Sequence, residues 1–291
     1  MTVGGPGAVD GQQELAGMPR RLYPCTPTRL TTWLDCPRRY RFTYLDRPAP
    51  PKGPPWGHTT LGAAAHVVLA WWWAQPFPRR VPALAGARLR ADWDPDRFRE
   101  QGFRDAAQSR TARERAAVWV EDYLSGVDPA AEPVGVERTV STPTSTLVLS
   151  GRVDRIDRRR DGLVVVDYKT GRREPGADDA RSSLALAVYA VAAARTLRRD
   201  CFRVELHHLP SRTVAAAEHT PESLRRKVSE AESIAADASR ADAAYAAGDR
   251  GDERFPSRPS ALCSWCDWRR HCPDGEAAAP QLEPWAAVEP E

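Results

Sequence analysis

GRVDRID at residues 151–157 and VVVDYKTG at residues 164–171 form the stretch on which the predicted fold depends. The segments alternate or run apolar and contain β-branched residues, and the charged residues between them are typical of a turn, so we expect two adjacent strands. Residues two apart on a strand point to the same face, so Asp167 and Lys169 project together while Tyr168 faces away. Asp154, on the neighbouring strand, can reach the same point.

This pair of carboxylates has a clear chemical use. Two acids on adjacent strands make a hard oxygen site that suits Mg²⁺ or Mn²⁺. A lysine beside such an ion, here Lys169, can orient or deprotonate an attacking water or offset charge in a transition state. The pattern therefore favours phosphodiester hydrolysis with Asp154, Asp167 and Lys169 as catalytic residues. The simpler alternative is a β-hairpin with exposed charges at its ends.

A second constellation consists of cysteines. Cys263 and Cys266 form a C-x-x-C pair, and Cys272 follows a short way downstream. Three thiolates at this spacing can hold one soft metal centre, with Cys36 as the candidate fourth ligand. From the residues alone, Zn²⁺ and an iron-sulfur cluster remain equal alternatives. Of the six cysteines, Cys25 and Cys201 are expected to be ordinary thiols, with Cys25 a weak substitute for Cys36.

The rest of the chain predicts an α/β core with a helical N-terminal layer. A helix over 28–45 must break near Pro37, because an interior proline removes a backbone hydrogen bond. Further helices are expected at 61–73, 96–107, 111–124, 182–198 and 221–247, and strands at 134–140, 146–156, 163–168, 202–209 and 213–218. Residues 1–22 and 275–291 are predicted to be disordered tails. The folded part, 23–274, divides into a helical part (26–125), a core (132–220) and a C-terminal helix with the cysteine segment (221–274).

With these motifs in place, the sequence resembles the PD-(D/E)XK nuclease superfamily and, within it, RecB-like and AddB-like exonucleases and the CRISPR-associated exonucleases of RecB type. The resemblance assigns a metal-binding role to Asp154 and Asp167 and a catalytic role to Lys169. It adds His66 as a metal ligand, because Gly62 to His66 fits the family's G-x-x-x-H helix. It also implies a restriction-endonuclease-like core, a small mixed sheet flanked by helices.

The resemblance extends to the cysteines. Residues 36–42 look like the C-P-x-R-Y-x-F segment of the iron-sulfur members, in which one upstream and three downstream cysteines hold a 4Fe-4S cluster. This implies a structural cluster on Cys36, Cys263, Cys266 and Cys272 that joins the two ends of the nuclease domain. Zn²⁺ stays the alternative.

One element departs from the family pattern. The family's Q-x-x-x-Y element follows the lysine strand, and here Tyr189 fits the tyrosine while Ala185 occupies the glutamine position. Supporting or DNA-binding roles are expected for Tyr189, Arg38 and Arg39. Glu137, in the preceding strand, is expected to act as an additional acid or to be a surface residue.

The predicted function is a divalent-metal-dependent DNA exonuclease in repair or recombination, acting on ends or single strands. The net charge of +3, from 42 basic and 39 acidic residues, does not by itself indicate a nucleic-acid binder. No phosphate-binding loop is present, so a helicase or ATPase would be a partner in trans. One rival is a catalytically weak DNA-binding scaffold in a repair or CRISPR-adaptation complex, and another is a zinc protein that binds nucleic acid through its arginines. With no secretory signal and no apolar run of about 18 residues, a cytoplasmic protein without a membrane span is expected.

Overall fold

The structure is a computed structural model that describes residues 22–288. The expected disorder of residues 1–21 and 289–291 lies outside the described residues. The helices are α1 (Pro27–Asp35), α2 (Pro37–Tyr44), α3 (Gly57–Trp73), α4 (Pro82–Asp92), α5 (Ala106–Ser125), α6 (Ala177–Ser182), α7 (Leu184–Leu197), α8 (Pro221–Ala246) and α9 (Pro273–Ala278). The strands are β1 (Tyr23–Cys25), β2 (Gly135–Pro143), β3 (Leu147–Arg159), β4 (Gly162–Lys169), β5 (Cys201–His208) and β6 (Thr213–Glu218). Short 3₁₀ turns are η1 (Phe77–Arg79), η2 (Pro95–Gln101), η3 (Ala261–Trp265), η4 (Arg269–His271) and η5 (Ala286–Val288).

The strands form one mixed sheet in the order β1-β3-β4-β5-β6, with β2 on the other edge of β3. β3 and β4 are antiparallel neighbours, and β4 runs parallel to β5 through the crossover helices α6 and α7. Parallel strands need such a crossover, whereas the tight turn at Gly162, with φ of 142°, suffices between β3 and β4. The predicted strands are confirmed, and β1 is an addition to them.

Both faces of β4 are buried, which explains its continuous apolar sequence. Val164, Val166 and Tyr168 pack into a cluster with the helical layer of α3, α4 and α5. Leu163 and Val165 point the other way, into a cluster with α7. A small mixed sheet flanked by helices, with an N-terminal helical layer and a C-terminal cysteine segment, is the fold class that the sequence predicted.

The helix expected over 28–45 is two helices. α1 ends at Asp35, Cys36 is extended with φ of −166°, and α2 begins with Pro37 at its first position. The expected helix at 96–107 is also corrected. The 3₁₀ turn η2 ends at Gln101, because the next residue, Gly102, has a left-handed φ of 80°, and α5 begins only after its N-cap residue Asp105. The sequence analysis missed α4 and α6.

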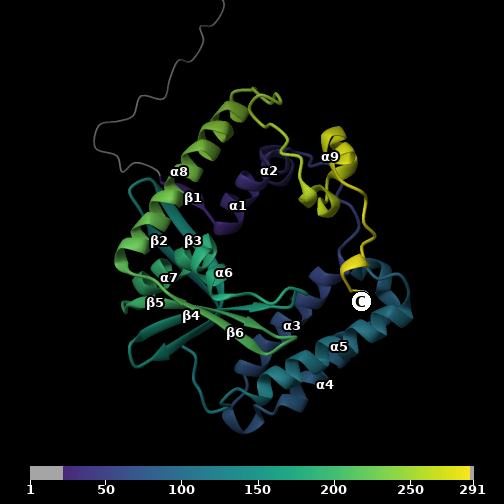
Figure 1. The fold of residues 1–291 in the computed structure, drawn as a ribbon, viewed down its shortest axis with the longest axis vertical. Coiled ribbons are helices and arrows are strands. Elements are labelled where there is room, and N and C mark those ends of the chain that lie inside the picture. The colour runs from purple at the N-terminus through teal and green to yellow at the C-terminus, as the bar shows by residue number, and fades with distance from the viewer. Residues whose placement is uncertain (1–21, 289–291) are drawn as a thin grey trace, which may run out of the picture.

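The C-terminal segment corrects the predicted tail. Residues 275–288 include the end of α9 and the turn η5, and Val288 is only 4% exposed within the cluster of α3 and α5. The Arg115 guanidinium donates to the Val288 carbonyl at 2.8 Å. These contacts return the chain to the helical layer, as Figure 1 shows at the end marked C.

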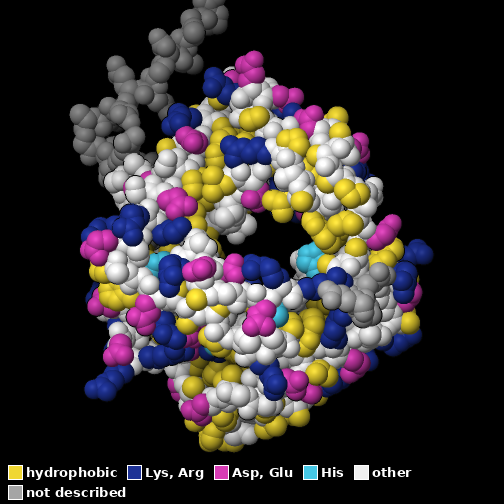
Figure 2. Space-filling view, in the orientation of Figure 1, with side chains coloured by type: hydrophobic (Ala, Val, Ile, Leu, Met, Phe, Trp, Pro, Cys, Tyr) yellow, Lys and Arg dark blue, Asp and Glu magenta, His cyan; other side chains and the backbone are white. Residues whose placement is uncertain are grey.

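The elements enclose an open middle. In Figure 1 the sheet with α7, the layer of α3 to α5, and the cysteine segment near α9 stand around it. Figure 2 shows that side chains leave an opening through the molecule at this place. Within residues 22–288, no helix combines the length and apolar character that crossing a membrane requires.

Candidate active site

Asp154 lies where β3 and β4 separate. The ladder pairs Arg155 with Val166, and beyond this pair the Asp154 carboxylate takes over, accepting a hydrogen bond from the Tyr168 backbone N–H at 2.8 Å. Its other oxygen lies 3.4 Å from Nδ1 of His66. Asp154 therefore has one oxygen fixed by β4 and one directed to the helix α3.

His66 approaches the same point from α3. Its Nε2 lies 3.2 Å from the Tyr168 carbonyl oxygen, to which a protonated Nε2 donates, and this leaves Nδ1 facing Asp154. A histidine that ligates a metal commonly donates its second ring nitrogen to a carbonyl in this way. Burial disfavours the charged imidazole, but the Asp154 carboxylate outweighs it and raises the pKa of His66 above its usual range. Gly62 makes the approach of α3 possible, because an added Cβ would lie 3.0 Å from Thr170 Oγ1.

Glu137 completes a group of three. Ligand atoms of His66, Glu137 and Asp154 all lie within 4.8 Å of one another. On β2, Glu137 stands between residues paired with Arg155 and Val153, so it faces Asp154 across the sheet. Burial and the Asp154 charge raise the pKa of Glu137, although its carboxylate pairs with Arg152 at 2.8 Å.

The backbone at Glu137 is strained. Its φ is 46°, in the left-handed region that a residue with a Cβ rarely adopts. Such strain costs about 1–3 kcal/mol and is concentrated at functional sites. From the sequence, Glu137 is expected only to act as an additional acid or to be a surface residue, because the amino-acid sequence of a strand does not reveal a positive φ.

Asp167 and Lys169 project together from the end of β4, as predicted. Lys169 Nζ lies 2.5 Å from Asp167 Oδ2 and forms an ion pair with it. Asp167 Oδ2 is buried and accepts no hydrogen bond of good geometry. Burial raises the pKa of Asp167, although the Lys169 charge opposes the shift. The Asp167 carboxylate is not in the three-residue group that the structure brings together, but its charge acts on His66.

Comparison with known families agrees with this geometry. The family model described as PD-(D/E)XK nuclease superfamily matches residues 24–273. The chain belongs to this superfamily. Its members are metal-dependent nucleases, so the group of His66, Glu137 and Asp154 is the candidate metal site of a nuclease. No curated protein matches the chain.

The donor set of this PD-(D/E)XK site fits a hard divalent cation. Two carboxylates and one imidazole suit Mg²⁺ or Mn²⁺, and these ions take further ligands from water or substrate phosphate. The site opens on a pocket of about 720 Å³, and the residues of α3 that line this pocket include Gly62, His66 and Ala70. The pocket leaves room for a substrate phosphate beside the three ligands.

A buried polar network holds the two halves of the site together. The Tyr168 hydroxyl accepts hydrogen bonds from Trp73 Nε1 of α3 at 3.2 Å and from Arg155 at 3.0 Å. Arg155 also donates to the Tyr123 hydroxyl at 3.0 Å and pairs with Asp157 at 2.9 Å. Tyr168 stands between Asp167 and Lys169, so this network fixes the strand that carries both.

Tyr189 lines the same pocket from α7. A Cβ on Gly151 would lie 2.4 Å from its ring, so the glycine is what allows the tyrosine to pack against β3. Ala185 precedes Tyr189 by one helical turn, on the same side of α7. Tyr189, which fits the tyrosine of the family's Q-x-x-x-Y element, therefore lies in the pocket of the candidate metal site.

The cysteine segment forms a separate pocket. Its lining includes all four predicted cysteines, Cys36 between α1 and α2 and the other three from residues 263–272, and the pocket has a volume of about 40 Å³. Backbone N–H groups of Arg39 and Ser260 point at Cys36 Sγ and Cys263 Sγ, each at 3.4 Å. Cys25 and Cys201 are buried elsewhere in the core, where burial raises their thiol pKa values to about 11 and about 12.

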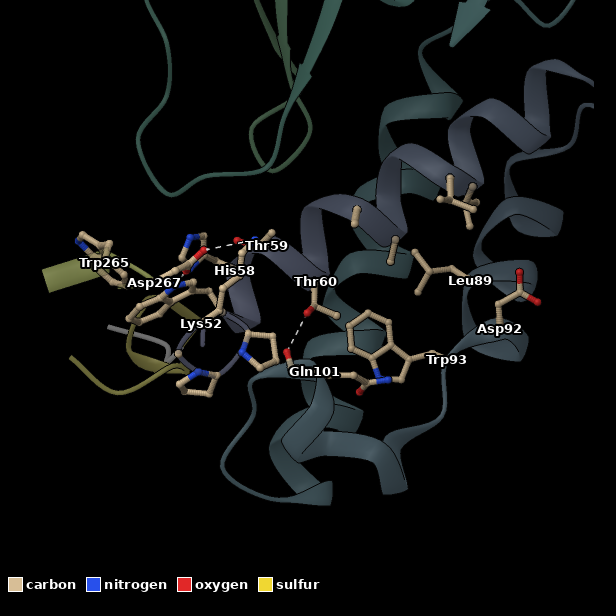
Figure 3. Close-up of a pocket in the computed structure, with 18 of the residues that line it drawn as sticks. Lys52, His58, Thr59, Thr60, Leu89, Asp92, Trp93, Gln101, Trp265 and Asp267 are labelled. Atoms are coloured by element: carbon tan, nitrogen blue, oxygen red, sulfur yellow. Dashed lines mark hydrogen bonds and ion pairs between the residues drawn. The ribbon is translucent and has the colours of Figure 1, made fainter. Parts of the chain in front are cut away.

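Arg38 and Arg39 have different surroundings. Arg38 is mostly buried, pairs with Asp252 and Asp274 at 2.9 Å each, and donates to Cys272 Sγ at 3.7 Å. It therefore supports the cysteine segment. Arg39 is 38% exposed, lies 3.6 Å from Asp35, and lines the pocket drawn in Figure 3.

Proposed function

We propose that this protein is a divalent-metal-dependent deoxyribonuclease that degrades DNA from ends or along single strands, in repair or recombination. The observation that carries the proposal is the convergence of His66, Glu137 and Asp154 on one pocket, with the Asp167–Lys169 ion pair at the end of the adjacent strand β4. A bound Mg²⁺ or Mn²⁺ would supply a Lewis acid for the scissile phosphate and lower the pKa of a water.

The chain's own residues account for the remaining steps. His66, Glu137 and Asp154 would hold the cation, and Asp167 is a third acid at the end of the neighbouring strand. Lys169, whose side chain is 47% exposed at the end of β4, can orient a water and offset charge on the phosphate as it is attacked. The Tyr168 N–H keeps the Asp154 carboxylate in place during this step.

The deciding experiment is a cleavage assay with Mn²⁺ or Mg²⁺ on single-stranded DNA labelled at either end. We expect metal-dependent release of short products that Lys169→Ala abolishes and that Lys227→Ala, a lysine on α8, leaves unchanged. Circular single-stranded DNA should resist if ends are required. DNA binding without cleavage in every metal would instead favour the scaffold of a repair or CRISPR-adaptation complex, and Ala185→Gln would then test whether the missing family glutamine is the cause.

We further propose that Cys36, Cys263, Cys266 and Cys272 hold a 4Fe-4S cluster. A single tetrahedral Zn²⁺ would bring its sulfurs to about 3.8 Å from one another. Among residues 22–288, only the His66 group has ligand atoms that all lie within 4.8 Å of one another, so no three of the four cysteine sulfurs are that close together. This spacing favours a cluster with several iron atoms over a single ion.

Anaerobic purification tests the cluster. We expect a brown protein with a broad absorption band near about 400 nm and with iron and sulfide in equal amounts. Cys36→Ser should remove the band, whereas Cys25→Ala should keep it, because Cys25 lies in the core at 2% exposure. A colourless protein containing one zinc would sink the cluster and favour the zinc rival. A helicase or ATPase partner in trans is part of the proposal, and co-purification from cells would test it.

A further inference from the structure

The pocket of the candidate active site continues along α3 into a second, larger one. This second pocket, of about 900 Å³, is shown in Figure 3. Both pockets are lined by Thr59, Ala63 and Val67, which follow one another at four-residue spacing on one side of α3. The two pockets therefore flank this exposed side of α3 and together form one groove across it, and α3 borders the opening seen in Figure 2.

The far end of the groove is aromatic. Trp56, at the start of α3, meets Trp265 of the cysteine segment with ring centroids 5.1 Å apart, and His58 meets the same Trp265 at 5.4 Å. The Trp56 indole N–H donates to Asp267 at 3.1 Å, which fixes its ring. Figure 3 shows His58, Trp265 and Asp267 gathered on one side of the pocket. None of the three rings belongs to the buried core.

Cationic groups stand beside the rings. Lys52, whose side chain is 65% exposed, and Arg39 line the pocket. The acids in the lining are engaged, since Asp267 accepts from Trp56 and Asp92 pairs with Arg88 at 2.5 Å. Exposed apolar side chains, Val67 at 63% and Leu262 at 50%, complete the walls. Aromatic faces with cations beside them are the combination that binds unpaired bases and their phosphates.

We propose that this groove binds the unpaired strand of the substrate and that Trp56, His58 and Trp265 stack on its bases. The proposal rests on the deoxyribonuclease function above and specifies its substrate as single-stranded DNA. Trp56 and His58 precede His66 by ten and eight residues, which is about 12–15 Å along a helix. At the 3.4 Å spacing of a stacked strand this is about four nucleotides, and fewer when the strand is extended. The stacked base thus lies two to four nucleotides from the scissile phosphate.

Single abasic sites test the position of the stacked base. Full-length protein with Mn²⁺ is given single-stranded oligonucleotides that carry one abasic site at successive positions from the cleaved bond. We expect cleavage to fall about 5- to 150-fold when the abasic site lies two to four nucleotides away, since each stacked base contributes about 1–3 kcal/mol. In Trp56→Ala and His58→Ala that penalty should largely disappear, because the ring that the base stacks on is gone. Phe77→Ala removes an exposed aromatic ring outside the pocket and should keep the full penalty.

Equilibrium binding separates this inference from the proposed function. The binding of single-stranded DNA to Lys169→Ala protein is measured by fluorescence anisotropy, and we expect it to weaken when His58→Ala is added. In the same assay, Lys52→Gln should reduce the slope of log binding constant against log salt concentration by about 0.7. If cleavage does not depend on the position of the abasic site, or if blunt duplex DNA binds as tightly as single-stranded DNA, the groove does not bind the unpaired strand. Either result would leave the proposed nuclease function unaffected. Loss of binding in His58→Ala without any cleavage in wild type would retain the groove and overturn the nuclease. Preference for single-stranded RNA over DNA would overturn the assignment of DNA.

Discussion

The Asp154 carboxylate accepts a hydrogen bond from the Tyr168 backbone N–H at 2.8 Å, at the point where the β3–β4 ladder ends. A side chain thus continues the pairing of two strands that have begun to separate. The separation opens the space that the candidate metal site occupies, and the hydrogen bond keeps one carboxylate oxygen from rotating. The other oxygen is left for His66 and a cation.

Glu137→Gly is expected to lower metal affinity and raise stability together. Glycine adopts a φ of 46° without strain, and the substitution removes a carboxylate that faces Asp154. We expect the metal-free protein to gain up to about 1 kcal/mol in urea unfolding, after the entropy that glycine loses. Half-maximal cleavage should need at least about tenfold more Mn²⁺, since one of three ligands is gone.

Arg212→Gly is the matched control for strain. Arg212 also has a positive φ, of 60°, in the turn between β5 and β6. It should stabilise the protein by a similar amount and leave the Mn²⁺ requirement unchanged. An unchanged Mn²⁺ requirement in Glu137→Gly would show that Glu137 is not a ligand.

Gly151→Ala should destabilise the fold through Tyr189. The new Cβ would meet the ring at 2.4 Å, and overpacking of this kind costs about 1–3 kcal/mol. Chemical denaturation should show that loss, and Tyr189→Ala should largely remove it in the double variant. At Gly171 a Cβ meets nothing within 4 Å, so Gly171→Ala should unfold like wild type. An equal loss at both glycines would argue against the packing role of Tyr189.

Arg155→Met is expected to loosen the join between the helical layer and the sheet. Arg155 is 5% exposed and donates to the Tyr123 and Tyr168 hydroxyls and pairs with Asp157, so its loss takes one hydrogen bond from each tyrosine and the ion pair from the carboxylate. Breaking a buried ion pair costs about 3–5 kcal/mol. Arg155→Lys should not restore stability, because an ammonium cannot reach three partners in one plane. Arg158→Met, at an exposed neighbour, should change little in the same thermal unfolding measurement.

Acid should weaken the fold through His207. Burial lowers its pKa below the ordinary 6.5, although Glu205 at 2.9 Å opposes the shift. Below pH 6.5 the imidazole of His207 binds a proton in the unfolded chain but not yet in the folded protein. The stability that the neutral ring allows is therefore fully present above pH 6.5 and is lost as the pH falls toward the lower pKa of His207 in the folded protein. The slope for one proton is at most about 1.4 kcal/mol per pH unit.

Urea unfolding at pH 7.5 and pH 5.5 measures this effect. His207→Gln removes the titrating ring, so its stability should fall less between the two pH values than that of wild type. His219, whose pKa burial also lowers, leaves a smaller residual dependence in both proteins. Equal losses in wild type and His207→Gln would show that His207 is not the source.

Much of the fold could be read from local patterns. The alternation and β-branching of residues 151–168 predicted β3 and β4, with Asp154 on the first and Asp167 and Lys169 together at the end of the second, because side-chain direction on a strand follows from the sequence alone. Pro37 likewise predicted the break between α1 and α2. The sequence pattern did not predict α4, α6 and β1, which are short or weakly patterned, because their formation depends on packing against neighbouring elements.

The tertiary structure alone decided what gathers at the site. Glu137 enters the metal group because β2 pairs with β3 in the register that sets it opposite Asp154, and register follows from long-range packing. The 275–288 segment folds back because α3 and α5 offer an apolar surface that its Val288 covers. The sequence by itself predicted Asp154, Asp167, Lys169 and His66 as candidates for the chemistry, and the distances between them come from strands and helices that only the folded core brings together.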